Sequence, residues 1–197
     1  FENNVVNSVG GGMSAVGRLS MTGTDFIRNV AGNGGGGLMA YSLSQVSGGL
    51  IQDNRGLNST ASGGGIWAIE GIAVTGTRFI SNTTGPVGQG GGLYAQKAIT
   101  LTEVAFYSGT ARFGGGAWAT GAAWLTGGLF QGNRSTTDNG GGLYSGDSLV
   151  VSGTQFVGNS AALSGGGAFV IGSATLTDAV FSYNRVLTYY GGGISVN

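Results

Sequence analysis

The side chains that could carry acid–base or nucleophilic chemistry are few in this chain of 197 residues. It has no histidine and no cysteine, and its single lysine is Lys97. Acid–base catalysis would therefore depend on carboxylates, which must converge in pairs to protonate a leaving group and to activate water. The eight acidic residues are Glu2, Asp25, Asp53, Glu70, Glu103, Asp138, Asp147 and Asp178.

The elements that would have to position these carboxylates follow from an internal repeat. Each copy starts with an anchor, F-x-x-N, passes through a variable loop, and reaches G-G-G followed by an apolar, a large and a small residue, as in FISNTTGPVGQGGGLYA. Spacings of 24 to 28 residues fit loops that vary in length around fixed strands, and they would destroy a helical heptad. The eight anchors are Phe1, Phe26, Ile51, Phe79, Phe106, Phe130, Phe156 and Phe181.

The residues after each glycine triplet alternate as in a β-strand. In Leu93-Tyr94-Ala95 and its equivalents, the first and third positions are apolar or small, so we expect them to face inward. A second strand precedes each later anchor, and a third strand carries the anchor itself. Four places ahead of each later anchor is a hydroxyl residue that we interpret as a bend: Thr22, Ser47, Thr75, Thr102, Thr126, Ser152 and Thr177.

This pattern predicts an all-β fold, a parallel β-solenoid in one domain spanning residues 1–197. Three short strands per coil cannot bury their apolar positions alone, but stacked coils pair every backbone group. About eight coils at a strand spacing of about 4.8 Å give a rod roughly 35 to 40 Å tall. We expect internal stacks of Phe1, Phe26, Phe79, Phe106, Phe130, Phe156 and Phe181, and of Asn4, Asn29, Asn54, Asn82, Asn133, Asn159 and Asn184, interrupted at Gly109.

Placed on this solenoid, the acidic residues do not converge. Glu103 and Asp178 share a position in the repeat but lie three coils apart, on the order of 14 Å, and Glu70 and Asp147 are separated in the same way. The G-G-x-G-x-D calcium repeat is absent, and no triplet is followed by the lysine of a phosphate-binding loop. We therefore expect no enzyme activity, no cofactor and no metal ion.

The middle position of the strand after each triplet is the most distinctive candidate site. If its neighbours face inward, these side chains face outward, one per coil, as a stripe about 20 Å or more long. Three interpretations remain open: same-face strand packing, contact with another protein copy, and stacking on sugar rings. The residues of this aromatic column are Met39, Trp67, Tyr94, Trp118, Tyr144 and Phe169.

Charge and hydropathy exclude several classes of partner. Eight basic and eight acidic residues give zero net charge without runs of one sign, which argues against nucleic acids and anionic membranes. No apolar run approaches the roughly 18 residues that span a bilayer. The chain starts within a motif and shows no obvious caps, which suggests a processed product or part of a longer precursor, or ends that pair with the next molecule into a filament.

The motif resembles a known repeat. F-x-x-N followed by G-G-A-[ILV]-Y-A is typical of the chlamydial polymorphic outer-membrane proteins and related bacterial surface proteins. FVGNSAALSGGGAFV and FISNTTGPVGQGGGLYA are similar to this motif, and the similarity covers the entire chain. The resemblance implies a right-handed parallel β-helix, the secreted passenger of a bacterial surface protein in a family associated with adhesion. A third glycine stands here where the family has alanine.

These observations predict a non-enzymatic, extracellular or cell-surface structural protein. We expect its partners to be other copies of itself, assembled head to tail or laterally through the aromatic column into a filament or layer. The alternative is an adhesin-type passenger that binds a cell-surface glycan or protein. A polysaccharide-degrading β-helix is the third possibility, disfavoured by the scattered carboxylates.

Overall fold

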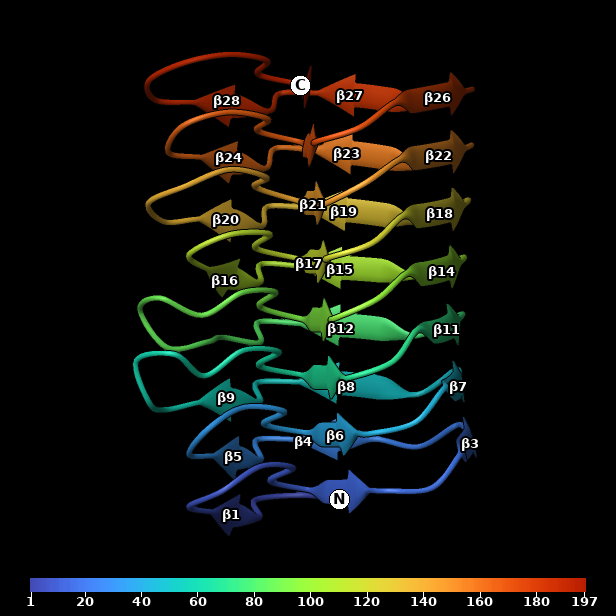
Figure 1. Ribbon diagram of the computed structural model, residues 1–197, viewed down its shortest axis with the longest axis vertical. Helices are drawn as coiled ribbons and strands as arrows, with labels where there is room; N and C mark the ends of the chain where they lie inside the picture. The colour runs from blue at the N-terminus through green and yellow to red at the C-terminus, as the bar shows by residue number, and fades with distance from the viewer.

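A computed structural model, which describes residues 1–197, shows an all-β parallel solenoid without helices. Eight coils stack along the long axis, and the two chain ends lie at opposite ends of the rod (Figure 1). The predicted fold class is confirmed. Parallel stacking follows from the repeat, because equivalent short strands in successive coils satisfy one another's backbone hydrogen bonds.

Three sheets run the length of the rod and correspond to the three predicted strands. The post-triplet sheet contains β2 (Met13–Ala15), β6 (Leu38–Ala40), β10 (Ile66–Ala68), β13 (Leu93–Ala95), β17 (Ala117–Ala119), β21 (Leu143–Ser145), β25 (Ala168–Val170) and β29 (Ile194–Val196). The hydroxyl sheet contains β3 (Leu19–Thr22), β7 (Ser44–Ser47), β11 (Ile72–Thr75), β14 (Ile99–Thr102), β18 (Ala123–Thr126), β22 (Leu149–Ser152) and β26 (Ala174–Thr177). The anchor sheet contains β4 (Phe26–Ile27), β8 (Leu50–Gln52), β12 (Arg78–Ile80), β15 (Ala105–Tyr107), β19 (Leu129–Gln131), β23 (Gln155–Val157) and β27 (Val180–Ser182).

Most coils also have a fourth strand, which the sequence did not predict. It has two residues and follows the anchor asparagine, on the side of the rod where the loops project in Figure 1. These side strands form two sheets, and Thr83 bridges to Arg55 on one side and to Thr110 on the other. The side strands are β1 (Val5–Val6), β5 (Val30–Ala31), β9 (Arg55–Gly56), β16 (Thr110–Ala111), β20 (Arg134–Ser135), β24 (Ser160–Ala161) and β28 (Arg185–Val186).

Each coil turns at residues with a left-handed backbone. One such corner lies two places after the anchor, where the residue is usually not glycine, as at Arg28 (φ 53°) and Tyr183 (φ 56°). A second corner directly follows the hydroxyl residue, as at Gly76 (φ 58°) after Thr75. The hydroxyl residues are therefore the last residues of their strands, and the bend that we assigned to them lies one residue later.

Each of the three glycines of a triplet is required for a different reason. Gly90 has φ 61°, a left-handed conformation that is costly for residues with a Cβ. A Cβ at Gly91 would lie 2.3 Å from the carbonyl oxygen of Gly115 in the next coil. A Cβ at Gly92 would lie 2.9 Å from the ring of Phe106, so even alanine does not fit without displacing the core.

The interior is a dry column of apolar side chains built around the anchors. Phe106 is stacked between Phe79 and Phe130, with ring centroids 4.5 and 4.7 Å away. The same arrangement continues through Phe156 to Phe181. Ile51 takes the place of a ring in the third coil and is completely buried, whereas Phe1, stacked on Phe26 at 4.8 Å, is 54% exposed at the end of the rod.

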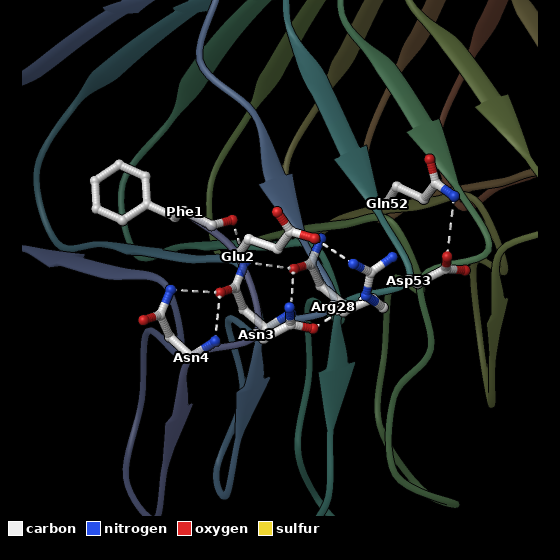
Figure 2. Close-up of polar contacts among 9 residues, drawn as sticks. Phe1, Glu2, Asn3, Asn4, Arg28, Gln52 and Asp53 are labelled. Carbon is white, nitrogen blue, oxygen red and sulfur yellow. Dashed lines mark hydrogen bonds and ion pairs between the residues drawn. The ribbon is translucent and has the colours of Figure 1, made fainter.

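The anchor asparagines form an amide ladder beside this stack. In the second coil, the side-chain amide of Asn29 donates to Oδ1 of Asn54 and to the carbonyl of Phe1, and the backbone N–H of Asn29 donates to the same Oδ1. Figure 2 shows the start of the ladder, where Asn4 donates from its backbone and side-chain nitrogens to Oδ1 of Asn29. Buried amides are tolerated here because their polar atoms are paired: Asn29, Asn54 and Asn159 have partners in the coils above and below, and Asn82 has them in the preceding coil.

Gly109 interrupts this ladder for a steric reason. The loop that follows it, residues 110–113, is the shortest between an anchor and a triplet. A Cβ at Gly109 would lie only 2.4 Å from the carbonyl oxygen of Gly115. The Gly109 N–H still donates to Oδ1 of Asn133, at 2.9 Å. Backbone therefore occupies the place that an asparagine side chain takes in the other coils.

Completing the ladder should weaken the protein. We expect Gly109→Asn to lower the free energy of unfolding by about 1–3 kcal/mol because of this overlap. Gly17→Ala is the matched control, since a Cβ there meets nothing within 4 Å, and we expect it to be neutral or stabilising by less than about 1 kcal/mol. Urea denaturation followed by circular dichroism measures both, and a more stable Gly109→Asn variant would contradict the steric explanation.

Removing one asparagine of the buried ladder should lower the free energy of unfolding more than removing an exposed asparagine does. Asn159→Leu leaves the carbonyl of Phe130 and both nitrogens of Asn133 without their partner, so we expect a loss of about 3 kcal/mol or more. Asn58→Leu removes an exposed bond to Asn33, and its effect should stay within about 0.5 kcal/mol. Equal losses in the same denaturation measurement would show that the ladder adds nothing to stability.

Candidate functional site

The aromatic column lies outside the central core, but it is not an exposed stripe. Met39 is 2% exposed, Tyr144 8% and Phe169 5%, and none of the three belongs to the core cluster. Trp67, Tyr94 and Trp118 are half-buried. The expectation of a solvent-facing contact surface is wrong for this column.

Neighbouring loops cover the column. The loop that contains Gly34 passes close to the outer side of the post-triplet sheet, so that a Cβ at Gly34 would lie 2.8 Å from Cε3 of Trp67. Phe113, in another of these loops, packs edge-on against Trp118 and Tyr144, with ring centroids 5.0 and 5.9 Å away. These loops vary in length and composition, so the periodicity of the strands could not predict that the loops cover the aromatic column.

The rings of the aromatic column are oriented toward one another and not toward a ligand. Trp118 and Tyr144 are parallel within 4° with centroids 3.7 Å apart, and Phe169 continues the stack 5.2 Å from Tyr144. From Trp118 to Phe169 the ring faces therefore lie against one another, where they are not free to receive a sugar ring, whereas Trp67 and Tyr94 meet edge-on at 61°. Nε1 of Trp118 donates to Oγ1 of Thr120, whereas the buried Nε1 of Trp67 has no partner within the protein.

Burial alters the ionisation of two tyrosines in this column. Desolvation raises the pKa of Tyr94 above its ordinary value, an effect opposed by the hydrogen bond with Thr120. Desolvation also raises the pKa of Tyr144, and the nearby carboxylate of Asp138 adds to the shift. In both cases burial disfavours the charged phenolate.

The acidic residues are dispersed over the rod. No three metal-ligating side chains are close enough together to hold an ion. Glu103 and Asp178 occupy the same left-handed corner in coils that are three repeats apart. Asp138 is the most enclosed carboxylate described here, with its side chain 15% exposed, and burial raises its pKa although Arg112, 3.4 Å away, opposes the shift. Its partner is thus a cation and not a second carboxylate.

Two flat sheet faces remain open to solvent. On the hydroxyl sheet, Thr75 and its equivalents lie in register from coil to coil, and their hydroxyls make no hydrogen bond within the protein. On the anchor sheet, the positions that flank each buried anchor are mostly apolar and half-buried. We call the outer surface of the anchor sheet the anchor face, and its apolar residues are Ile27, Leu50, Ile80, Ala105, Tyr107, Leu129, Val157 and Val180.

Sequence reasoning also missed a row of arginines. Arg55, Arg134 and Arg185 each follow an anchor asparagine, so the side strands place them in one exposed column along the rod. The repeated dipeptide Asn-Arg was the available signal. It was overlooked because the chain contains no run of basic residues, and only the coil brings these positions together.

Comparisons with models of protein families, with curated proteins and with solved structures return no match for this chain. The structure also has no helix long and apolar enough to cross a membrane. The assignment of a function therefore depends on the surfaces described above.

Alkaline titration tests whether the column is covered. In the folded state the pKa values of Tyr94 and Tyr144 lie above the unfolded value of 10.0. The contribution of the two neutral phenols to the free energy of unfolding is therefore complete below the unfolded pKa and is lost as the pH rises through the folded pKa. We therefore expect Tyr94→Phe/Tyr144→Phe to unfold at higher pH than the parent and to lose the late part of the tyrosinate absorbance change. Tyr183→Phe, at a residue 91% exposed, is the control. An unchanged late phase in the double variant would contradict the burial.

Proposed function

We propose that this protein is a non-enzymatic, extracellular or cell-surface structural module, a rigid rod that associates laterally with further copies of itself. The observation that supports this proposal is the anchor face. It replaces the aromatic column, which is covered, as the surface through which copies would pack.

The anchor face has the character of a protein contact surface. It spans seven in-register strands, and Arg78 is the only charged residue in them. Its outward side chains other than Arg78 are aliphatic, Tyr107, three glutamines and Ser182. A flat apolar patch without charge repulsion favours association, since each buried apolar Å² contributes about 25 cal/mol.

The size of this face suggests an array more than an isolated dimer. Seven strands at about 4.8 Å and three residues per strand give roughly 300 Å². A stable protein interface buries about 800 Å² per partner, so one such contact alone would be weak. Lateral association would therefore depend on concentration and gain strength where each molecule has several neighbours, as in a layer or filament.

The arrangement of polar groups supports a structural role. The buried amides are used by the ladder and the backbone groups by neighbouring coils, while the carboxylates are dispersed over several columns. A polysaccharide-degrading enzyme would need two of those carboxylates on one substrate. The regular ladders instead suit a load-bearing rod.

An adhesin-type passenger is the second candidate function. The unpaired arginines of the side strands favour it, because they offer a binding surface on a different side of the rod from the anchor face. The two functions are compatible, since a self-associating rod can present a binding surface along its length.

Charging the anchor face should abolish self-association. We expect the parent to sediment with a concentration-dependent increase in size, and Tyr107→Lys/Val157→Lys to remain monomeric because the apolar contact would bury two cations. Thr75→Lys/Thr126→Lys adds the same charge to the hydroxyl sheet, with the same spacing of two coils, and should associate like the parent.

Sedimentation velocity and negative-stain images give the readout, and circular dichroism verifies folding. A parent that is monomeric at every concentration would contradict lateral assembly. Equal loss of association in both double variants would show that net charge, and not this face, is responsible.

A further inference from the structure

Arg134, Ser160 and Arg185 lie in register on three successive side strands. Arg134 pairs with Ser160, and Ser160 with Arg185. The two arginines are thus two coils apart, about 9.6 Å along the rod. Their side chains and that of Ser160 line one pocket with a volume of about 250 Å³, which also includes Thr136 and Leu187.

The two guanidinium groups have no counter-charge. The ion pairs of the protein are Arg28 with Glu2 and Arg112 with Asp138. Figure 2 shows that Arg28 pairs with the carboxylate of Glu2, and that its Nε donates to Oδ1 of Asn3. Arg134 and Arg185 make no side-chain hydrogen bond, and no carboxylate lines their pocket. In a chain with zero net charge, the pocket therefore concentrates two uncompensated positive charges.

The remaining polar groups show which donors are available. The backbone nitrogens of Ser160 and Arg185 are used by carbonyls of the preceding coil. Oγ1 of Thr136 donates to the carbonyl of Ala111. The hydroxyl of Ser160, between the arginines, makes no hydrogen bond within the protein. The lining of the pocket thus holds two arginines and one hydroxyl that have no hydrogen-bond partner within the protein.

The geometry points to an oxyanion-binding site that takes the carboxylate or sulfate group of an acidic sugar. Guanidinium groups bind such anions through paired, charge-assisted N–H donors. Water occupies about 30 Å³ per molecule in the liquid, so a pocket of about 250 Å³ has room for more than a bare tetrahedral anion. Leu187, which is exposed, provides an apolar wall for the ring that carries the anion.

This site goes beyond the proposed lateral assembly, and its test is independent of it. The arginines lie on the side strands, and the anchor face lies on another sheet. A failure of sugar binding would leave association intact, and a monomeric protein could still bind the sugar.

Calorimetric titration of the full chain with a sulfated uronic-acid disaccharide tests the site. Arg134→Gln and Arg185→Gln should each weaken binding by about tenfold or more, the equivalent of one charge-assisted hydrogen bond. Arg55→Gln is the matched control, because Arg55 lies in the same column between Val30 and Thr83, and that column has no second arginine within two coils of it. It should bind like the parent.

Two further probes separate the possible sources of the anion. Inorganic sulfate should compete only weakly, and the desulfated, carboxyl-reduced disaccharide should not bind. The inference is overturned if the neutral disaccharide binds as well as the charged one, if inorganic sulfate binds equally tightly, or if Arg55→Gln loses as much affinity as Arg185→Gln. Equal competition by a short oligonucleotide would also overturn it, because that result indicates unspecific attraction of polyanions.

Discussion

The hydrogen bond between a residue and its equivalent one coil away is the interaction on which this structure depends. No coil has a second layer of its own to pack against, so its backbone groups and its apolar side chains are satisfied only by the coils above and below. Every regularity of the sequence follows from this constraint. Like residues recur because they stack on like residues, as Phe79 does on Phe106 and Asn29 on Asn54. Residues that vary are those that leave the stack, chiefly in the loops before the glycine triplets.

The sequence predicted those parts of the fold that are repeated. The anchors, the three long sheets and the amide ladder follow from a period of about 25 residues combined with alternation of apolar side chains. Two-residue side strands such as β20 are too short to show alternation, so they could not be predicted in this way. The steric cause of the gap at Gly109 was equally hidden, because it depends on the length of the following loop and on the position of Gly115.

The candidate site was predicted less well because exposure is a property of the whole coil. Alternation correctly indicated that Tyr144 points away from the core, but it could not show that Phe113 covers it. The converse holds for Arg134 and Arg185. They are separated by 51 positions in the sequence, and nothing short of the coil register brings them to one pocket. In a solenoid, the residues of one binding site are whole repeats apart in the sequence, so the site is recognised only when equivalent positions of successive coils are compared.

The interruption at Gly109 divides the amide ladder of the rod into two segments. Asn4 to Asn82 form one continuous chain of amides and Asn133 to Asn184 another, and Asn82 has no amide in the next coil to which it can donate. The stacked rings of Phe79, Phe106 and Phe130 and the backbone bonds cross this junction without help from side-chain amides. The chain thus consists of two amide-linked segments, of four and of three coils, that are joined through the coil of Gly109 by ring stacking and by hydrogen bonds of the backbone.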